Sequence, residues 1–599
     1  MLFLAAVLLL TAAFALPGAW LKRNIGRVRR AAESVRAAVD PVGEDDESTG
    51  AEGSDEKSPS EIFTAALYDG DNPLSYAADT SRIYWWKSDF SDEYYFFLPS
   101  GIHDKELRWE FNTAENVAVD GQNVHDGDYF QLADGVHTLR VTPEGGKEEV
   151  YRVNVMRSRS IPSLFLTTRS GENDYIQADK NNSESGDIVL KSENGSILYA
   201  GEVSDLKCRG NSTFNDSMKK PYRIKLADEA DLLGMGAAKK WILIANDFDP
   251  SLERNMLANY LADLLKIPFQ TQAHYVDLYL NGEYQGNYLL SEKVEVGADR
   301  VDIRDLDKET EEMNGYSGLS KEIKKASTVK EAHDYGAYQT ESTALKEEPS
   351  DLTGGYLLEY EVDYRLDDEY SYFHTSMNHN LVLKSPEYAT EDEVHYIGDL
   401  FERFEEALYS DSGYNGQGEY YQDFIDTDAF CRKYILEELS KNMDSSYTSQ
   451  YIIKEPDDVK KEFIPGPGWD YDMSFGNVVL SGDDVYYLRQ PQALYAALEK
   501  DDRGLWYGLY LHEDFRDMAK DEYRTFLSEG AEEKAMDYLQ QQTQTIIRSA
   551  LMNNIRWNKY PDLQTDGERN AAFLQEVKQL AEFYSTRLEW MALSFGISQ

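Results

Sequence analysis

The order of periodic patterns along the chain constrains its fold most strongly. Short segments with alternating apolar and polar residues, separated by Gly, Asp, Asn and Pro, recur from about residue 62 to residue 294. Helical spacing of apolar residues occurs at 252–265, 393–409 and 420–442, and it dominates after about residue 510. Strands followed by helices are typical of α+β proteins. Because 599 residues exceed the usual size of one domain, the sequence predicts two or three.

Residues 61–157 predict a β-sandwich of the immunoglobulin or cadherin type. The segment consists of short strand-like runs at regular spacing, with turn residues between them. It contains no cluster of catalytic residue types. We therefore expect a spacer or binding module that folds separately from the rest of the chain.

Residues 158–599 form the main predicted domain. Within it, 305–350 is rich in charged and small polar residues and predicts a surface insertion, partly helical, while 505–599 predicts a helical C-terminal part. The strand-like runs 275–280 and 284–294 flank an Asn-Gly pair, which is typical of a tight hairpin turn.

The first 20 residues carry no charge, so residues 1–21 predict a signal peptide or a membrane anchor. Basic residues follow this run, and for an uncleaved span they would place the body in the cytoplasm. An Ala-Phe-Ala sequence inside the run instead fits a cleavage site. Residues 22–60 have the composition of a disordered linker. We expect the N-terminal segment to meet a membrane and the body to be anchored or secreted, on the extracellular side.

The formal net charge is −49. A polyanion repels nucleic-acid phosphates, so the composition argues against nucleic-acid binding and favours a solvated acidic surface. Any site for a nucleotide must gather its own cations. The two cysteines, Cys208 and Cys431, are expected to be buried free thiols.

Two aspartates lie on either side of a predicted hairpin. Asp444 follows a predicted helix, strand-like runs occur at 451–454 and 463–464, and Asp470 comes next in Trp-Asp-Tyr-Asp. Phosphoryl-transfer enzymes of the protein-kinase type place a proton-accepting Asp and a metal-binding Asp in this order. Asp472 is an equal rival for the metal role, because alternate residues of a strand face opposite sides. In a chain with 109 acidic residues, the same spacing also fits ordinary surface charges.

Several segments, taken together and in order, resemble the CotH kinase family. They are Arg-Gly-Asn-Ser-Thr (209–213), Lys-Lys-Pro-Tyr-Arg-Ile-Lys-Leu (219–226), Asn-Asp-Phe-Asp-Pro-Ser-Leu-Glu-Arg-Asn (246–255), Leu-Asn-Gly-Glu-Tyr-Gln-Gly-Asn-Tyr-Leu-Leu-Ser-Glu-Lys-Val (280–294), Gly-Gly-Tyr-Leu-Leu-Glu (354–359), Asn-Met-Asp-Ser-Ser-Tyr (442–447) and Trp-Asp-Tyr-Asp-Met-Ser-Phe-Gly (469–476). The resemblance implies an atypical protein-kinase fold that uses ATP with Mg²⁺ or Mn²⁺ to phosphorylate surface or secreted proteins.

The resemblance also implies roles for individual residues. Asp444 would be the catalytic base, and Asp470 or Asp472 the metal ligand. A kinase catalytic loop usually adds an Asn shortly after its Asp as a second metal ligand, whereas this chain has Thr448, Ser449 and Gln450 there. This departure weakens the expectation of a second metal ion.

In protein kinases, a Lys on a strand pairs with a Glu on a helix at the nucleotide-binding site, and we expect such a pair here. Lys225 and Glu253 are the first candidates for this pair, and the neighbours Glu292 and Lys293 are the second. Arg209 and the small-residue loop after it could also contact phosphate. For Lys225, an exposed strand cation without a ligand is an equally good interpretation.

The chain is thus expected to be an active kinase of the CotH type, with a protein substrate that the sequence does not identify. The alternative is a non-catalytic surface or spore-coat protein that uses a kinase-like body for binding. The two interpretations differ in the site rather than in the fold.

Overall fold

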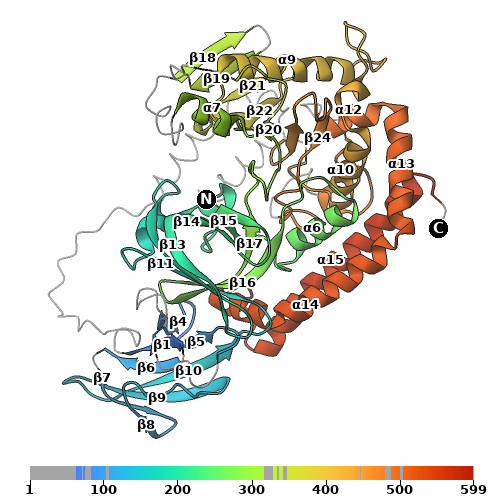
Figure 1. Cartoon of the computed structure of the whole chain (residues 1–599). Helices are drawn as coiled ribbons and strands as arrows, with labels where there is room; N and C mark the ends of the chain where they lie inside the picture. Colours follow the sequence, from blue (N-terminus) through green and yellow to red (C-terminus); the bar gives the residue numbers. More distant parts are fainter. Residues whose placement is uncertain are drawn as a thin grey trace, which may run out of the picture. The chain divides into compact units, whose positions relative to one another are not determined.

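The computed structural model describes residues 63–597 except 70–71, 74–81, 103–106, 113, 316–327, 334–335, 342–346, 348, 446, 479–486 and 499–503. The predicted signal or anchor (1–21) and linker (22–60) lie outside these residues. Over the described ranges the chain is α+β, as the sequence predicted (Figure 1). A search of the same ranges finds no helix with the length and apolar character needed to span a membrane.

Residues 63–157 form two β-sheets. The first has the order β2-β1-β3 with β6 on β1, and the second has the order β4-β5-β10-β9-β7-β8. The strands are β1 (Phe63–Asp69), β2 (Asn72–Pro73), β3 (Arg82–Ile83), β4 (Trp86–Lys87), β5 (Tyr94–Leu98), β6 (Leu107–Phe111), β7 (Ala114–Val119), β8 (Gln122–Val124), β9 (Gly135–Pro143) and β10 (Glu149–Arg157). Both sheets contribute to one apolar core, for example through Trp109 and Val153.

That core continues beyond the two sheets. Tyr279 and Tyr284, which lie farther along the chain, and Leu551 of a C-terminal helix belong to the same buried cluster. The rings of Phe97 and Tyr284 lie 4.9 Å apart. The segment therefore has its own strands but shares apolar surface with the main domain, and its separate folding stays a prediction.

A seven-stranded closed barrel follows. Its order is β11-β12-β13-β14-β15-β17-β16. The strands are β11 (Ser163–Thr168), β12 (Glu184–Lys191), β13 (Ile197–Cys208), β14 (Tyr222–Asp231), β15 (Ala237–Ile244), β16 (Ala273–Leu280) and β17 (Glu283–Glu292), and the helices between them are α4 (Asp174–Ala178), α5 (Ser212–Asp216) and α6 (Arg254–Leu264). Asn281 and Gly282 join β16 to β17 with φ of 51° and 83°, which confirms the predicted tight hairpin.

The next part is a second seven-stranded sheet with helices. Its order is β18-β19-β21-β22-β20-β23-β24. The elements are α7 (Leu306–Asn314), β18 (Thr328–His333), β19 (Gly336–Glu341), β20 (Tyr356–Glu361), the 3-10 helix η2 (Asp363–Asp368), β21 (Tyr372–His374), β22 (Asn380–Ser385), α9 (Glu391–Leu408), the 3-10 helix η3 (Tyr421–Phe424), α10 (Thr427–Ser440), β23 (Tyr451–Lys454) and β24 (Phe463–Pro465). The predicted insertion 305–350 thus supplies a helix and two strands, and β19 pairs with β21.

The C-terminal part is helical, as predicted. Its helices are α12 (Leu505–Leu511), α13 (Glu513–Ser528), α14 (Ala531–Arg556) and α15 (Asp566–Ser594). The two longest, α14 and α15, pack against each other (Figure 1). A capping box at Thr565 and Glu568 starts α15, because their side chains pair with the free backbone N–H groups of its first turn.

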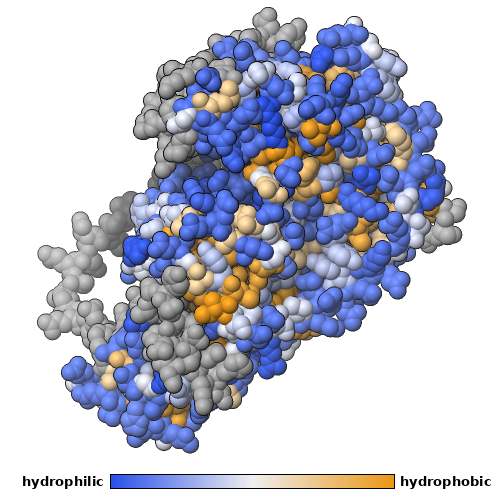
Figure 2. All heavy atoms as spheres, viewed as in Figure 1, coloured by the Kyte–Doolittle hydropathy of each residue, from blue (hydrophilic) through white to orange (hydrophobic). Residues whose placement is uncertain are grey.

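The surface in view is mostly hydrophilic, with scattered apolar patches (Figure 2). On this face the surface agrees with the expectation of a solvated exterior. Cys208 and Cys431 are both buried and free, as the sequence predicted.

A buried ion pair ties α15 to α10. Arg587 and Glu438 are both fully buried, and their charged atoms lie 2.5 Å apart. Arg587 also donates to the carbonyls of Pro491 and Ala493, while Glu438 accepts from the backbone of Tyr495. The pair therefore also fixes the segment 491–495.

Replacing Arg587 with Met should lower the free energy of unfolding by about 3–5 kcal/mol, because it leaves the Glu438 carboxylate buried without its partner. Urea denaturation would measure the change. The control is Lys578→Met, which breaks an exposed pair with Glu582 and should cost less than about 1 kcal/mol. Equal losses in both variants would contradict the role of the buried pair.

Candidate active site

The loop after α10 carries Asp444. Lys441 ends the helix in a left-handed conformation, and its ammonium donates to the carbonyls of Tyr487, Gln490 and Gln492 at 2.7–2.9 Å. The backbone N–H of Asp444 donates to Asn442 Oδ1 at 3.2 Å. None of these contacts uses the Asp444 carboxyl, so that carboxyl is not needed to keep the shape of the loop.

The second loop follows β24 and carries Asp470 and Asp472. Gly466 N–H donates to the carbonyl of Tyr451 at 2.7 Å, which starts the loop beside β23. Asp470 has φ of 64°, a conformation that Asp tolerates better than most residues. The Asp470 side chain is exposed, whereas Asp472 is buried. The chain here is a loop, so the alternation expected of a strand does not decide between the two aspartates.

The three carboxyl groups lie close enough to influence one another. Burial and the neighbouring Asp470 raise the pKa of Asp444 to about 7. Burial, Asp470 and Asp444 raise the pKa of Asp472 well above its usual range. Asp470 reaches solvent but protein atoms surround it, and this desolvation raises its pKa as well. The fold therefore brings together the aspartates that the sequence singled out.

Such a cluster fits a divalent cation. Carboxylate oxygens are the ligands that Mg²⁺ and Mn²⁺ prefer. In the described part of the chain, no group of three or more acidic, His or Cys side chains is arranged to enclose a metal ion. Mg²⁺ in nucleotide sites commonly takes one or two protein carboxylates and completes its shell with phosphate oxygens and water, so a full set of protein ligands is not required.

Two arginines face the acidic cluster. Arg209 and Arg365 both oppose the rise in the pKa of Asp470. Arg209 is half-buried, with its guanidinium 5.7 Å from the ring centre of Trp469. Arg365 of η2 donates to Glu361 at 3.1 Å and to Thr448 at 3.0 Å. Arg209 was predicted from the sequence, whereas Arg365 was not.

Further cations gather where the barrel meets the second sheet. Lys293 lies 3.3 Å from Glu295, which also pairs with Lys240 at 2.9 Å. Burial lowers the pKa of Lys293, Glu295 opposes this effect, and Lys384 adds to it. Lys384 itself pairs with Glu359 and Glu369 at 3.4 and 3.1 Å. Lys240, Lys293 and Lys384 are thus each paired with a glutamate, and together they form a local group of cations in an acidic chain.

The structure does not bring Lys225 and Glu253 together. Lys225 is exposed on the outer side of β14. Glu253 is fully buried at the start of α6, where Thr543 donates to its Oε1 at 2.8 Å. Its Oε2 has no hydrogen-bond partner among the residues that the structure describes. The predicted strand-to-helix pair is therefore wrong as a pair.

Glu292 and Lys293 do not pair with each other either. Glu292 is buried and lies 2.8 Å from Arg300, while Lys293 contacts Glu295. Consecutive residues at the end of a strand point to opposite faces, which separates the two side chains. Lys293 therefore belongs to the group of cations around Glu295, whereas Glu292 is engaged elsewhere by Arg300.

The missed residues of the site had a weak signal in the sequence. Glu359 and Glu361 occupy alternate positions in the otherwise apolar β20, so they share one face. Charged residues inside a buried strand are unusual and indicate a polar site. Lys384 joins the site only because β22 pairs with β20, whereas Arg365 pairs with Glu361 within one segment, as an i,i+4 pair.

Comparison with known proteins adds the family. A model of the family described as "CotH kinase protein" matches residues 206–591. No curated protein matches the chain. The matched residues include both aspartate loops and the helices α12–α14, and they leave out the two sheets of 63–157. Because the match covers more than half of the chain, the protein belongs to the CotH kinase family.

Proposed function

We propose that the chain is a protein kinase that uses ATP with Mg²⁺ or Mn²⁺ and acts on surface or secreted proteins. The main support is the meeting of Asp444 with Asp470 and Asp472, from loops on either side of the β23–β24 hairpin. Membership of the CotH family supports the same activity. The extracellular setting stays a prediction from residues 1–21.

In this proposal, Asp444 accepts the proton of the attacking hydroxyl. Its pKa near neutrality suits a general base. Asp470 or Asp472 would hold the divalent cation, whose charge would neutralise that of the nucleotide phosphates. Arg209 and Lys293 are the cations proposed to bind the phosphate groups. Positioning and charge provide most of the catalysis in phosphoryl transfer, and these residues supply both.

The alternative is a binding protein without catalysis. Thr448 stands in the stretch where a kinase loop usually carries its second metal ligand, and it is already engaged. Its hydroxyl donates to Glu361 at 2.9 Å and accepts from Arg365. This observation favours at most one metal ion, or a family member that has lost activity and serves as a surface or spore-coat component.

An experiment with ATP and Mg²⁺ distinguishes the kinase from the non-catalytic binding protein. The kinase should incorporate labelled γ-phosphate into itself or into a casein-like acceptor. ATP with Mg²⁺ should also raise its melting temperature, because a ligand at 100 times its Kd stabilises the folded state by about 2.7 kcal/mol. ATP with EDTA serves as the control. Absence of both incorporation and thermal shift would support the non-catalytic alternative.

A further inference from the structure

We infer that the start of helix α6 positions the loop that carries Asp470 and Asp472, with Asn255 as the central positioning residue. The inference rests on the proposed kinase function, since it assigns a role in holding the metal-binding carboxylates. It concerns residues 246–255, which the proposed function leaves without a role.

Asn255 holds the loop at its middle. Its side-chain oxygen accepts the backbone N–H of Tyr471 at 2.8 Å. Tyr471 stands between Asp470 and Asp472, so this bond fixes the backbone that carries both carboxyl groups. Asn255 Nδ2 donates to Asn246 Oδ1 at 3.0 Å, which sets the orientation of the amide. Asn255 is only 6% exposed, so water does not replace these bonds.

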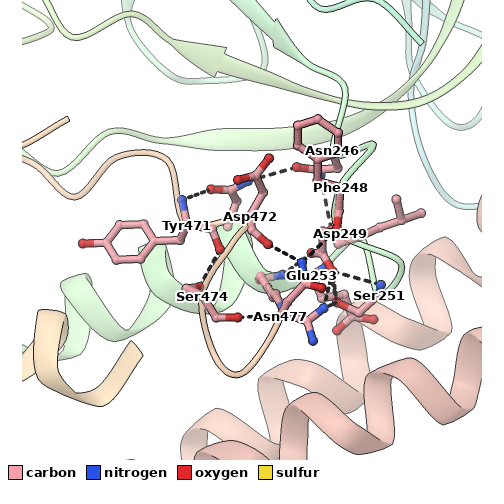
Figure 3. A network of polar contacts seen from close by, with 12 residues as sticks. Asn246, Phe248, Asp249, Ser251, Glu253, Tyr471, Asp472, Ser474 and Asn477 are labelled. Carbon is pink, nitrogen blue, oxygen red and sulfur yellow. Dashed lines mark hydrogen bonds and ion pairs between the residues drawn. The ribbon is translucent and has the colours of Figure 1, made fainter. Parts of the chain in front are cut away.

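Arg254 holds the end of the loop. Its Nε donates to the carbonyl of Ser474 at 3.1 Å, while its Nη1 donates to the carboxylate of Asp249. Asp249 also accepts the backbone N–H of Arg254 at 2.8 Å, which ties the guanidinium to the start of the helix. Asn477 completes the connection by donating to the carbonyls of Phe248 and Asp472 at 2.8 and 2.6 Å (Figure 3).

Gln270 holds the beginning of the loop. Its Oε1 accepts the backbone N–H of Gly468 at 2.9 Å. Its Nε2 donates to Asn259 of α6 at 3.1 Å. The helix and the residues around it therefore contact the loop at its beginning, middle and end.

These contacts matter because the loop is irregular. Asp470, Phe475 and Gly476 all have positive φ, so no strand or helix ladder dictates its course. Removing the Asn255 side chain would leave the Tyr471 N–H buried without its acceptor. The Tyr471 hydroxyl would still donate to Glu437 at 2.6 Å, which keeps the ring anchored. We therefore expect a local shift of the carboxylates rather than loss of the fold.

The consequence should be weaker metal binding. Residues that orient metal ligands typically change metal affinity or activity by about 10- to 100-fold when they are replaced. Asp444 is held by other contacts, so the turnover at saturating metal should fall less than the metal affinity. This separation distinguishes positioning from a general loss of stability.

The test compares Asn255→Ala with Asn314→Ala in the full chain. Asn314 is also 6% exposed and also bonds through its side chain, but to Thr310 and Glu347 rather than to the loop. Mn²⁺ binding is measured with a non-hydrolysable ATP analogue present. Hydrogen exchange is followed in the peptide that covers residues 468–477. Gln270→Ala is a second, milder variant in case Asn255→Ala folds poorly.

We expect Asn255→Ala to weaken Mn²⁺ binding about 10- to 100-fold and to speed exchange in 468–477, with the same direction in Gln270→Ala. Asn314→Ala should change neither. Wild-type Mn²⁺ affinity and protection in both loop variants would overturn the inference. If wild type binds no Mn²⁺ with the nucleotide analogue, the proposed function fails. In that case the exchange measurement still decides whether α6 holds the loop.

Discussion

Replacing Asp444 with Asn should lower the rate of phosphate transfer by about 10²- to 10⁴-fold, the usual contribution of a general base. Asn keeps the size of the side chain and removes its ability to accept a proton. The loop should keep its shape, because the Asp444 carbonyl accepts from the backbone of Tyr447 and Thr448 independently of the side chain. Initial rates of labelled γ-phosphate incorporation measure the effect, and the ATP-dependent thermal shift should survive.

A matched control for this substitution is Asp307→Asn. Burial raises the pKa of Asp307 to about 7, as it does for Asp444, but Asp307 belongs to α7 and accepts from the backbone of Glu387. The control should therefore keep its transfer rate. Equal rates in wild type and Asp444→Asn would remove Asp444 from the proposed mechanism. A loss in both variants would point to general damage from neutralising a carboxylate.

Local chemistry made a large part of this structure predictable. The Asn281-Gly282 pair could only favour a tight turn, and alternating residues on either side of it had to form a hairpin. The helix 252–265 follows from its apolar spacing, and the structure has α6 at Arg254–Leu264. The two aspartate loops could be recognised because each follows a regular element whose end is apparent in the sequence. The first loop follows α10 and the second follows β24.

Contacts made across long distances in the sequence could not be predicted in the same way. Glu253 is buried against Thr543, which is 290 residues away, so no local pattern shows that it is unavailable to Lys225. The register of β14 against β15 places Lys225 opposite Lys240 on the outside of the barrel. Side-chain pairing across elements depends on register and closure, and these are properties of the whole sheet.

The insertion illustrates the same limit. Its polar composition predicted a surface segment, yet β18 and β19 extend the second sheet through one pairing of Gln339 with Tyr372. Polar strands at the edge of a sheet have a weak sequence signal, because neither face needs to be apolar.

Removing the proposed metal-binding carboxylate should abolish the response of the protein to Mg²⁺. We expect Asp470→Asn to eliminate both the Mg²⁺-dependent thermal shift with ATP and phosphate transfer, since Asp470 is the exposed carboxyl of its loop and lies beside Arg209. Calorimetric titration with Mg²⁺ and a non-hydrolysable ATP analogue would measure binding directly. Asp472→Asn is the matched comparison, one residue away on the same backbone.

The melting temperature without nucleotide separates lost binding from unfolding. Burial raises the pKa values of Asp444, Asp470 and Asp472, and neighbouring carboxylates add to the rise for Asp444 and Asp472. Ionising these groups in the absence of a cation therefore costs folding free energy. Neutralising one of them relieves part of this repulsion, and the metal-free variants should melt at or above the wild-type temperature. A variant that melts normally and ignores Mg²⁺ has lost a ligand. If Asp472→Asn rather than Asp470→Asn behaves in this way, the metal role belongs to Asp472, and a full Mg²⁺ response in both variants would rule out this loop as the metal site.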